Sequence, residues 1–185
     1  MAFRILYYET VESTNDLALQ FAKEGAAEGT VIAADFQTKG RGRQKREWIS
    51  PRGKGLLFSV ILRPALSASS APILTHLAGE AVAEALKKEA GLACTLKKPN
   101  DVLVGGKKIA GILTESSGTG DRIDYVVIGI GLNVTTEKRH LLKTATSIWV
   151  EIGKKVAKEA LLTQILSLFW AKYGKISSTQ KRAIS

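Results

Sequence analysis

At residues 101–116 the chain reads DVLVGGKKIAGILTES, and this stretch indicates the class of fold. Two apolar segments flank Gly105 and Gly106, and a glycine pair between such segments is typical of the tight turn of a β-hairpin. Another buried strand, RIDYVVIGIGLNV, follows at residues 122–134. Strands joined by hairpins, in a chain that also has helical segments, predict an α+β fold. We expect a mixed, largely antiparallel sheet with helices packed on one side.

Further strands and helices are predicted on both sides of this hairpin. Residues 13–25, STNDLALQFAKEG, begin with capping residues and space their apolar side chains at helical intervals. Residues 55–63, GLLFSVILR, form an unbroken apolar run, which is typical of a central strand that is buried on both faces. The other predicted strands cover residues 3–9, 29–36 and 93–98, the other helices cover residues 71–90 and 158–175, and a loop covers residues 144–149.

The composition limits the kind of protein. A chain of 185 residues is long enough to bury the core of one domain. Its formal net charge of +10 favours an anionic partner, such as nucleic acid, a phosphate-rich ligand or an acidic protein. The single cysteine, Cys94, excludes a disulfide framework within the chain and suits a reducing compartment. Because no apolar stretch has the length of a signal peptide or a membrane-spanning helix, we expect a cytoplasmic protein without a membrane partner.

A segment rich in glycine and arginine occupies residues 36–59 and reads FQTKGRGRQKREWISPRGKGLLFS. Its glycines allow the backbone to approach a ligand closely. The guanidinium groups of Arg41 and Arg43 suit carboxylates and phosphates, and Trp48 offers an apolar plate for a flat ligand. These residue types predict a loop that folds over an anionic small molecule. From the spacing alone, a solvated basic loop or a non-specific contact with a phosphate backbone fits equally well.

A second polar segment, TLKKPNDVLVGGKKIAGILTE, lies at residues 95–115 and includes the predicted hairpin. Asp101 could bind Mg²⁺ or orient a donor, and Asn100 could recognise a polar edge of a ligand. The hairpin brings in Lys108, which could neutralise a carboxylate or phosphate, together with Glu115. Taken alone, the Pro-Asn-Asp sequence is simply a turn.

Five motifs occur in the order found in biotin protein ligases. They are STN at residues 13–15, GRGRxxxxWxSPxGxGL at 40–56, KxPND at 97–101, KIAGIL at 108–113 and GIGLNV at 129–134. The chain resembles the catalytic domain of this family over roughly residues 3–175. We therefore expect a catalytic domain at residues 1–176, followed by a tail at residues 177–185.

The resemblance implies an ATP-dependent ligase with two half-reactions. Such an enzyme activates biotin as biotinyl-5′-AMP and transfers it to a specific lysine of a biotin carboxyl carrier protein, such as that of acetyl-CoA carboxylase. Biotin, ATP and Mg²⁺ would be required, a homodimer is one possible assembly, and DNA is not an expected partner. The basic loop fits this chemistry, because the biotin carboxylate and the α-phosphate are both anions that must meet. A closing loop would also shield the intermediate from water.

The resemblance implies a set of site residues as well. Arg41, Arg43 and Lys108 would be catalytic, because they would lie nearest the reacting carboxylate and phosphate. The implied biotin contacts are Ser13, Thr14, Asn15, Gln37, Gly40, Arg41, Arg43, Lys108, Gly111, Leu113, Gly129 and Gly131. The implied nucleotide contacts are Arg43, Arg46, Trp48, Asn100, Asp101 and Asn133, and Asp101 is also the candidate metal ligand. Gly42 would belong to the same loop, and the STN residues could also cap the first helix.

The chain departs from the family's pattern in three places. Lys98 stands where the family usually has Trp between the Lys and Pro of KxPND, which adds a cation and removes an aromatic plate. No helix-turn-helix precedes the first catalytic strand, so we expect a monofunctional enzyme without repressor activity. The family's small C-terminal β-barrel domain is also absent. Two interpretations remain open: the protein is a minimal form of the enzyme, or the chain is truncated.

Two rival functions predict different behaviour. A lipoate–protein ligase would share the fold and the adenylation chemistry but not the GRGRxxxxW loop. A basic nucleic-acid-binding module would account for the net charge. Against it, many of the cations lie within ligand motifs, and no sequence motif for reading DNA or RNA is visible.

Overall fold

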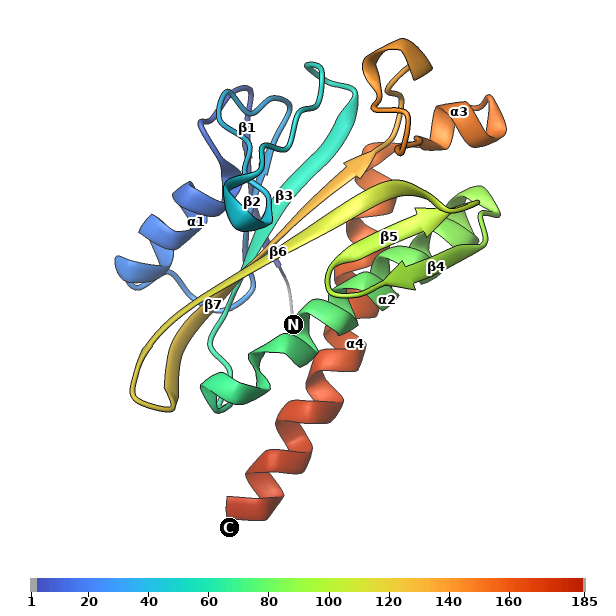
Figure 1. Cartoon of the computed structure of the whole chain (residues 1–185). Coiled ribbons are helices and arrows are strands. Elements are labelled where there is room, and N and C mark those ends of the chain that lie inside the picture. The colour runs from blue at the N-terminus through green and yellow to red at the C-terminus, as the bar shows by residue number, and fades with distance from the viewer. Residues whose placement is uncertain (1–2, 185) are drawn as a thin grey trace.

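The computed structural model describes residues 3–184, with side chains from residue 3 to residue 176. Seven strands form a single sheet in the order β1-β2-β3-β7-β6-β5-β4 (Figure 1). The strands are β1 (Arg4–Tyr8), β2 (Thr30–Ala34), β3 (Gly55–Leu62), β4 (Cys94–Lys97), β5 (Asp101–Val104), β6 (Lys107–Thr119) and β7 (Arg122–Asn133). The α-helices are α1 (Thr14–Lys23), α2 (Ala71–Ala90), α3 (Ile148–Ile152) and α4 (Lys158–Ile184), and short 3-10 helices occupy η1 (Arg43–Lys45), η2 (Ala68–Ser70) and η3 (Lys138–His140).

The sheet confirms the expected mixed, largely antiparallel arrangement. Strand β1 pairs with β2 in parallel, and all the other pairs are antiparallel. The β5–β6 hairpin turns at Gly105 and Gly106, whose φ angles of 54° and 78° lie in the left-handed region that glycine adopts without strain. Every residue of β3 is buried, as its unbroken apolar run predicts.

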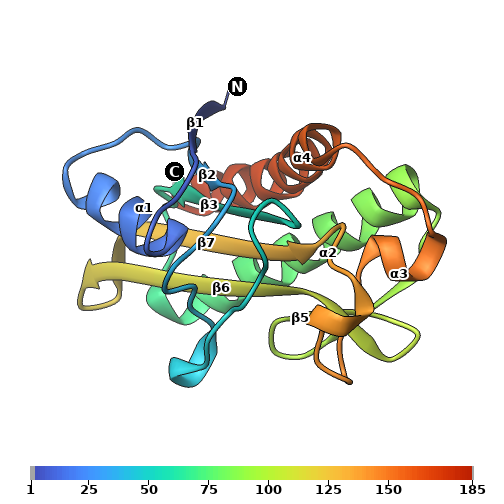
Figure 2. The ribbon, with the colours of Figure 1, turned by 90° about the horizontal axis from the view of Figure 1, so that it is seen from above.

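The two faces of the sheet are covered by different helices (Figure 2). Phe58, Val60 and Leu62 of β3 belong to the larger core, which includes the buried faces of the long helices α2 and α4. Ile61 points the other way and packs with Ala18 of α1 in a smaller core. The expectation of helices on one side is therefore right for α2 and α4 and wrong for α1. The helical spacing of α1 could not show which face it covers.

Helix α3 was missed by the sequence prediction, which has a loop through Trp149. The side chain of Ser147 accepts a hydrogen bond from the backbone N–H of Val150 at 3.1 Å and so caps the helix. Gly153 ends it with a left-handed φ of 63°. At five residues the helix is too short to show a hydrophobic period.

Helix α4 packs along α2 on the face of the sheet opposite α1 (Figure 1). It continues to Ile184, whereas the predicted helix ends at residue 175. The predicted division of the chain at residue 176 stays a prediction, because the side chains beyond that point lie outside the described residues. Among the described residues, no helix has the length and apolar character needed to cross a membrane.

Candidate functional site

The register of the strands brings the glycine-containing motifs together on the face that carries α1. In one row across the sheet, Ser59 of β3 lies beside Gly129 of β7, which lies beside Leu113 of β6. The next row consists of Leu57, Gly131, Gly111 and Asp101. A Cβ added to Gly129 would collide with the side-chain amide of Asn15, so the bare backbone there leaves room for the start of α1. Motifs that are remote in sequence thus form one surface.

A buried polar cluster stands over this surface at the start of α1. The backbone N–H and the hydroxyl of Thr14 both donate to Oε1 of Gln37, at 2.7 and 3.0 Å. The hydroxyl of Ser59 lies 2.8 Å from Oγ1 of Thr14 and 2.6 Å from Oδ1 of Asn15. Ser13 caps α1 through its side-chain oxygen. The four residues predicted for the biotin head group are therefore brought together, and the capping role weighed for the STN residues is confirmed for Ser13.

Arg41 is held by two carboxylates. Its Nη1 and Nη2 donate to the two oxygens of Glu115 at 3.0 and 2.7 Å, and Nη2 also lies 2.6 Å from Oδ1 of Asp16. Burial alone would lower the pKa of this guanidinium, but the hydrogen bonds and charges of Glu115 and Asp16 outweigh that effect and raise its pKa. Glu115 Oε2 accepts a further hydrogen bond from Nδ2 of Asn15 at 2.8 Å. Arg41, which is predicted to contact the ligand, is thus linked to α1 and β6 by ion pairs.

Trp48 lies over the second row of the sheet. A Cβ added to Gly131 would collide with its indole, and one added to Gly111 would come within 3.0 Å of the same ring. The backbone N–H of Trp48 donates to the carbonyl of Gly40 at 2.9 Å, and the ammonium of Lys108 lies 5.4 Å from the ring centroid. The indole Nε1 is buried without a hydrogen-bond partner among the described residues. The aromatic plate therefore rests on the surface that the predicted biotin glycines form.

Lys108 and Asp101 form an ion pair beside this plate, with Nζ and Oδ1 2.7 Å apart. No cluster of three or more His, Cys, Asp and Glu residues that could hold a metal ion occurs within the described part of the chain. Mg²⁺ in nucleotide sites needs only one or two protein carboxylates, because substrate phosphates and water supply the other ligands. Asp101 fits a metal ion that is held in this way.

The asparagines predicted for the nucleotide support neighbouring backbone. Asn100 Nδ2 donates to the carbonyl of Ile112 at 2.8 Å. Asn133 Nδ2 donates to the carbonyl of Thr146 at 3.0 Å, and this anchors the segment before α3 to the end of β7. Both side chains are therefore fixed near the ends of the site strands.

The tip of the glycine-arginine segment lies apart from the rest. Arg43, Lys45 and Arg46 are exposed, and none of them forms an ion pair with another residue whose side chain is described. Gln44 and Lys45 have φ angles of 56° and 60°, which are uncommon for residues with side chains. Two of the predicted site residues, Arg43 and Arg46, are thus not brought into the buried cluster.

Three residues of the site received no role from the sequence: Asp16, Ser59 and Glu115. Ser59 could have been noticed, because it is the one hydroxyl within the apolar run at residues 55–63. Asp16 gave no such signal, and Glu115 stood out only as part of the hairpin, because their shared partner, Arg41, depends on how α1 and β6 meet in three dimensions.

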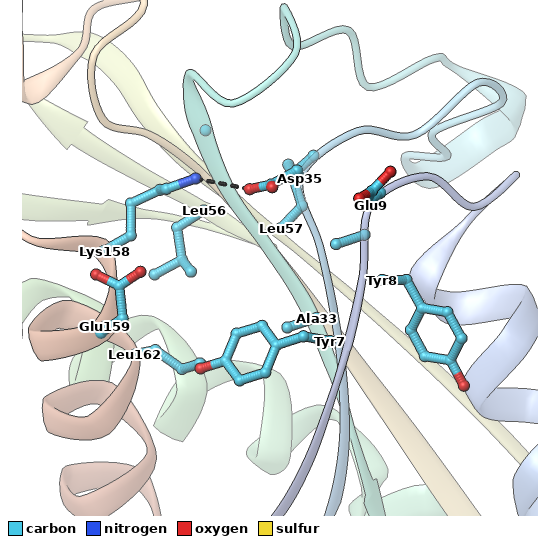
Figure 3. A pocket seen from close by; sticks show the side chains of 12 residues that line it. Tyr7, Tyr8, Glu9, Ala33, Asp35, Leu56, Leu57, Lys158, Glu159 and Leu162 are labelled. Carbon is cyan, nitrogen blue, oxygen red and sulfur yellow. Dashed lines mark hydrogen bonds and ion pairs between the residues drawn. The ribbon is translucent and has the colours of Figure 1, made fainter.

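A separate cavity of about 230 Å³ lies between the end of β1 and the start of α4 (Figure 3). Tyr7, Leu56 and Leu162 contribute to its apolar lining, and an ion pair between Lys158 and Asp35, 2.9 Å long, lies at its edge. None of the predicted biotin or nucleotide residues lines it. The glycine-floored surface and the polar cluster above it therefore remain the candidate site.

Comparison with known proteins agrees with the motifs and the geometry. Residues 7–133 match the model of the biotin/lipoate A/B protein ligase family, which is more than half of the chain. The chain belongs to this family. Its mixed sheet is the fold of biotin protein ligase catalytic domains, as the solved structures below show.

Three family members illustrate the similarity. The bifunctional ligase/repressor BirA of Bacillus subtilis is 39% identical over 177 residues, which make up 94% of this chain and 54% of that protein. The biotin–[acetyl-CoA-carboxylase] ligase of Paracoccus denitrificans is 42% identical over 129 residues, 66% of this chain and 51% of that protein. The solved biotin protein ligase from Aquifex aeolicus, in complex with biotin and ATP, has a TM-score of 0.82 and 31% identity, covering 95% of this chain and 72% of that one. The chain spans about half the length of these two curated relatives.

Proposed function

We propose that this chain is the catalytic part of a biotin protein ligase, which activates biotin with ATP and transfers it to a lysine of a carrier protein. The observation that carries the proposal is the glycine-floored surface, where Gly129 lies beneath the buried polar cluster and Gly111 and Gly131 lie beneath the indole of Trp48. Because these glycines carry no side chains, a flat fused-ring ligand can lie close to the strands once that indole moves aside. The relatives named as biotin ligases support the same assignment.

The polar cluster suits the head group of biotin. A ureido ring presents one carbonyl acceptor and two N–H donors, and it needs partners for all three when it is buried. Ser13, Thr14, Asn15 and Gln37 provide hydroxyl and amide groups of both kinds within one small region. Leu113 and the three floor glycines would contact the apolar faces of the rings.

In the first half-reaction, a carboxylate oxygen of biotin attacks the α-phosphorus of ATP. An O–P bond forms, the bond to the pyrophosphate oxygen breaks, and pyrophosphate leaves with that electron pair. The two reacting groups are both anionic, so cations must offset their repulsion. Lys108 stands beside the floor, and Arg43 is carried on an exposed tip that can fold over the ligand. Mg²⁺, which Asp101 would help to hold, supplies further positive charge to the phosphates.

In the second half-reaction, the neutral amine of the carrier lysine attacks the carbonyl carbon of the mixed anhydride. A C–N bond forms, the C–O bond to AMP breaks, and the amine loses a proton to solvent. The carrier lysine is the nucleophile, so none of this chain's side chains need become covalently modified. What the chain must do is exclude water, and Trp48 with its loop lies where the anhydride would be covered. Arg46, Asn100 and Asn133 would contact the nucleotide.

The proposal extends to the setting of the reaction. The acceptor would be a biotin carboxyl carrier domain, the compartment would be the cytoplasm, and neither DNA nor a membrane would take part. Monofunctional activity and the assembly state, including a homodimer, stay predictions.

The decisive experiment is biotin transfer. The chain is incubated with biotin, MgATP and a carrier domain, and the product is detected by avidin blotting, with a carrier whose target lysine is replaced by arginine as the control. We expect labelling that requires ATP and the target lysine. Calorimetry with biotin and lipoate then tests specificity, and tighter binding of lipoate would indicate a lipoate ligase. DNA binding without biotin transfer would instead favour the nucleic-acid-binding module.

A further inference from the structure

Both terminal nitrogens of the Arg41 guanidinium are committed inside the protein, and its Nε is buried without a partner among the described residues. Glu115 accepts from Nη1 and Nη2 in a bidentate pair, and Asp16 accepts from Nη2 as well. Bidentate pairs between arginine and a carboxylate are among the strongest hydrogen-bonded contacts that side chains make. The three side chains are only partly exposed, at 37% for Arg41, 28% for Glu115 and 50% for Asp16. Arg41 is therefore a bound cation.

The charge of this cluster does not favour an added anion. One guanidinium between two carboxylates leaves one net negative charge, so a biotin carboxylate brought to Arg41 would meet repulsion. The remaining donor of Arg41, Nε, is buried away from solvent. To bind the biotin carboxylate with its terminal nitrogens, Arg41 would have to release Glu115, and that carboxylate would then be partly buried and without its cation. Arg43 carries the same charge, is exposed, and pairs with no carboxylate among the residues whose side chains are described. Among the same residues, Lys108 has a single carboxylate partner, Asp101.

We infer that Asp16 and Glu115 are positioning residues of the biotin site, which hold Arg41 as a brace rather than as a contact for the ligand's carboxylate. This inference rests on the proposed function. Arg41 forms an isolated bridge with Glu47, and Trp48 is bonded to Gly40, so the two stems of the loop form a short ribbon. Fixing Arg41 therefore fixes the stem that carries Trp48 over the floor.

Glu115 acts on a second predicted biotin contact at the same time. Its Oε2 accepts from Nδ2 of Asn15, which also donates to the carbonyl of Leu113 at 3.2 Å. With the amide nitrogen engaged on this side, Oδ1 of Asn15 faces Ser59. The Glu115 carboxylate thus orients both the side-chain amide of Asn15 and the stem of the loop. Its loss should therefore weaken binding of the biotin rings equally, whether the ligand ends in a carboxylate or in an uncharged group.

The test compares biotin with biotinol, the uncharged alcohol analogue, by calorimetry on the wild-type chain and on Arg41→Met, Glu115→Gln and the double variant. We expect each single change to weaken both ligands by a similar factor, about tenfold, because a charge-assisted contact is lost. The ratio of the two Kd values should stay that of the wild type. The loss in the double variant should be clearly smaller than the product of the two single losses, because both changes remove the Arg41–Glu115 pair.

Matched variants separate positioning from general damage. Arg122→Met removes an exposed arginine that also pairs with a carboxylate, Asp124 at 3.1 Å, and should leave both Kd values unchanged. Arg41→Lys keeps the charge and should recover part of the affinity for both ligands. Adenylate formation by Glu115→Gln should show a raised KM for biotin with kcat nearly unchanged. Thermal unfolding of every variant identifies any that fails to fold, and Asp16→Asn, at the most exposed position, is then the milder replacement.

Opposite outcomes overturn the assignment. If Arg41→Met weakened biotin but not biotinol, Arg41 would contact the carboxylate directly. Additive losses in the double variant would show that Arg41 and Glu115 act separately. If the wild-type chain bound neither ligand, the proposed function would fall and this assignment with it. Binding of biotin by the wild type, followed by either of the first two outcomes, would overturn the assignment alone.

Discussion

Arg41 and Arg43 are two residues apart in one motif, and their surroundings differ sharply. Arg41 is held by Asp16 and Glu115 and carries the stem of the loop against α1 and β6. Arg43 lies on the exposed tip and forms no ion pair with any residue whose side chain is described. An arginine side chain can therefore stabilise the loop at one position of the motif, as Arg41 does, and be available to a ligand two residues later, as Arg43 is. The sequence motif alone does not distinguish these two roles.

The backbone shows the same contrast between stem and tip. The stem is held at Gly40 and Trp48 by a backbone hydrogen bond of 2.9 Å. The tip closes on itself, with the N–H of Gly42 donating to the carbonyl of Arg46 at 2.7 Å. Its left-handed residues, Gln44 and Lys45, are both exposed, so no burial of their side chains offsets the strain. We therefore expect the tip to move while the stem stays in place.

The largest effect is expected at the floor beneath the stem. Gly131→Ala would place a methyl group inside the indole of Trp48, and the backbone of a buried central strand cannot retreat. Overpacking of this kind costs about 1–3 kcal/mol of folding free energy. Because the indole and the biotin rings share this floor, we expect a cost of similar size in binding, so biotin affinity should fall roughly 10- to 100-fold. The control is Gly174→Ala, where an added Cβ meets nothing within 4 Å. Equal biotin affinity in the two variants, measured by calorimetry, would mean that Trp48 is not fixed over the floor.

At the tip, Arg43→Ala should damage function without damaging the fold. We expect biotin to bind about tenfold more weakly and biotinyl-5′-AMP to be released early, because a charge-assisted contact is lost. The free energy of unfolding should change by less than about 1 kcal/mol, because an exposed cation that pairs with none of the described side chains contributes little. Calorimetry, retention of the intermediate on a desalting column and thermal unfolding give the three measurements. Unchanged affinity and retention would refute the role of Arg43.

Limited proteolysis tests the division directly. We expect the tip, residues 42–46, to become ordered when biotin or its adenylate binds, so cleavage by trypsin there should slow several-fold. Without ligand, cleavage should occur after Arg43, Lys45 and Arg46 on the tip and be slower after Arg41, which its carboxylate partners hold. Mass spectrometry of the fragments identifies the sites. Equally rapid cleavage after Arg41 would remove the distinction between stem and tip.

The smallest effect concerns the partner. If the carrier domain is acidic, the charge of +10 should speed its encounter with this chain, and salt should screen that attraction beyond about 8–10 Å. Raising salt from about 0.05 to 0.5 M should slow transfer several-fold more than adenylate formation, which depends on contacts at short range. Single-turnover transfer from preformed biotinyl-5′-AMP measures the difference. A transfer rate that does not change with salt concentration would mean that the net charge does not speed the encounter with the carrier.

Much of the floor could be predicted because it depends on local signals. The glycine pair at 105–106 sets the β5–β6 hairpin, and the apolar runs mark the central strands, so the row of Gly111 and Gly131 follows once β6 and β7 pair. The brace could not be predicted in the same way. Its hydrogen bonds join residues 74 positions apart, and they depend on which face of the sheet α1 covers. An amphipathic helix does not specify that face, and our prediction placed all the helices together.

The lone hydroxyl of Ser59 has a consequence for which molecules this surface rejects. It sits in an otherwise apolar strand, contacts Asn15 on one side, and is connected through Thr14 to Gln37 on the other. Side chains that are fixed by hydrogen bonds in this way cannot reorient to bind a different ligand. A ring without hydrogen-bonding atoms, such as the dithiolane of lipoate, would offer these polar groups no partner of its own. Sites of this type can discriminate by factors of roughly 10⁴–10⁵ against an analogue that lacks the matching polar atoms. Selectivity would then come less from the shape of the floor than from the free-energy cost of covering these polar groups with a ligand that forms no hydrogen bonds to them.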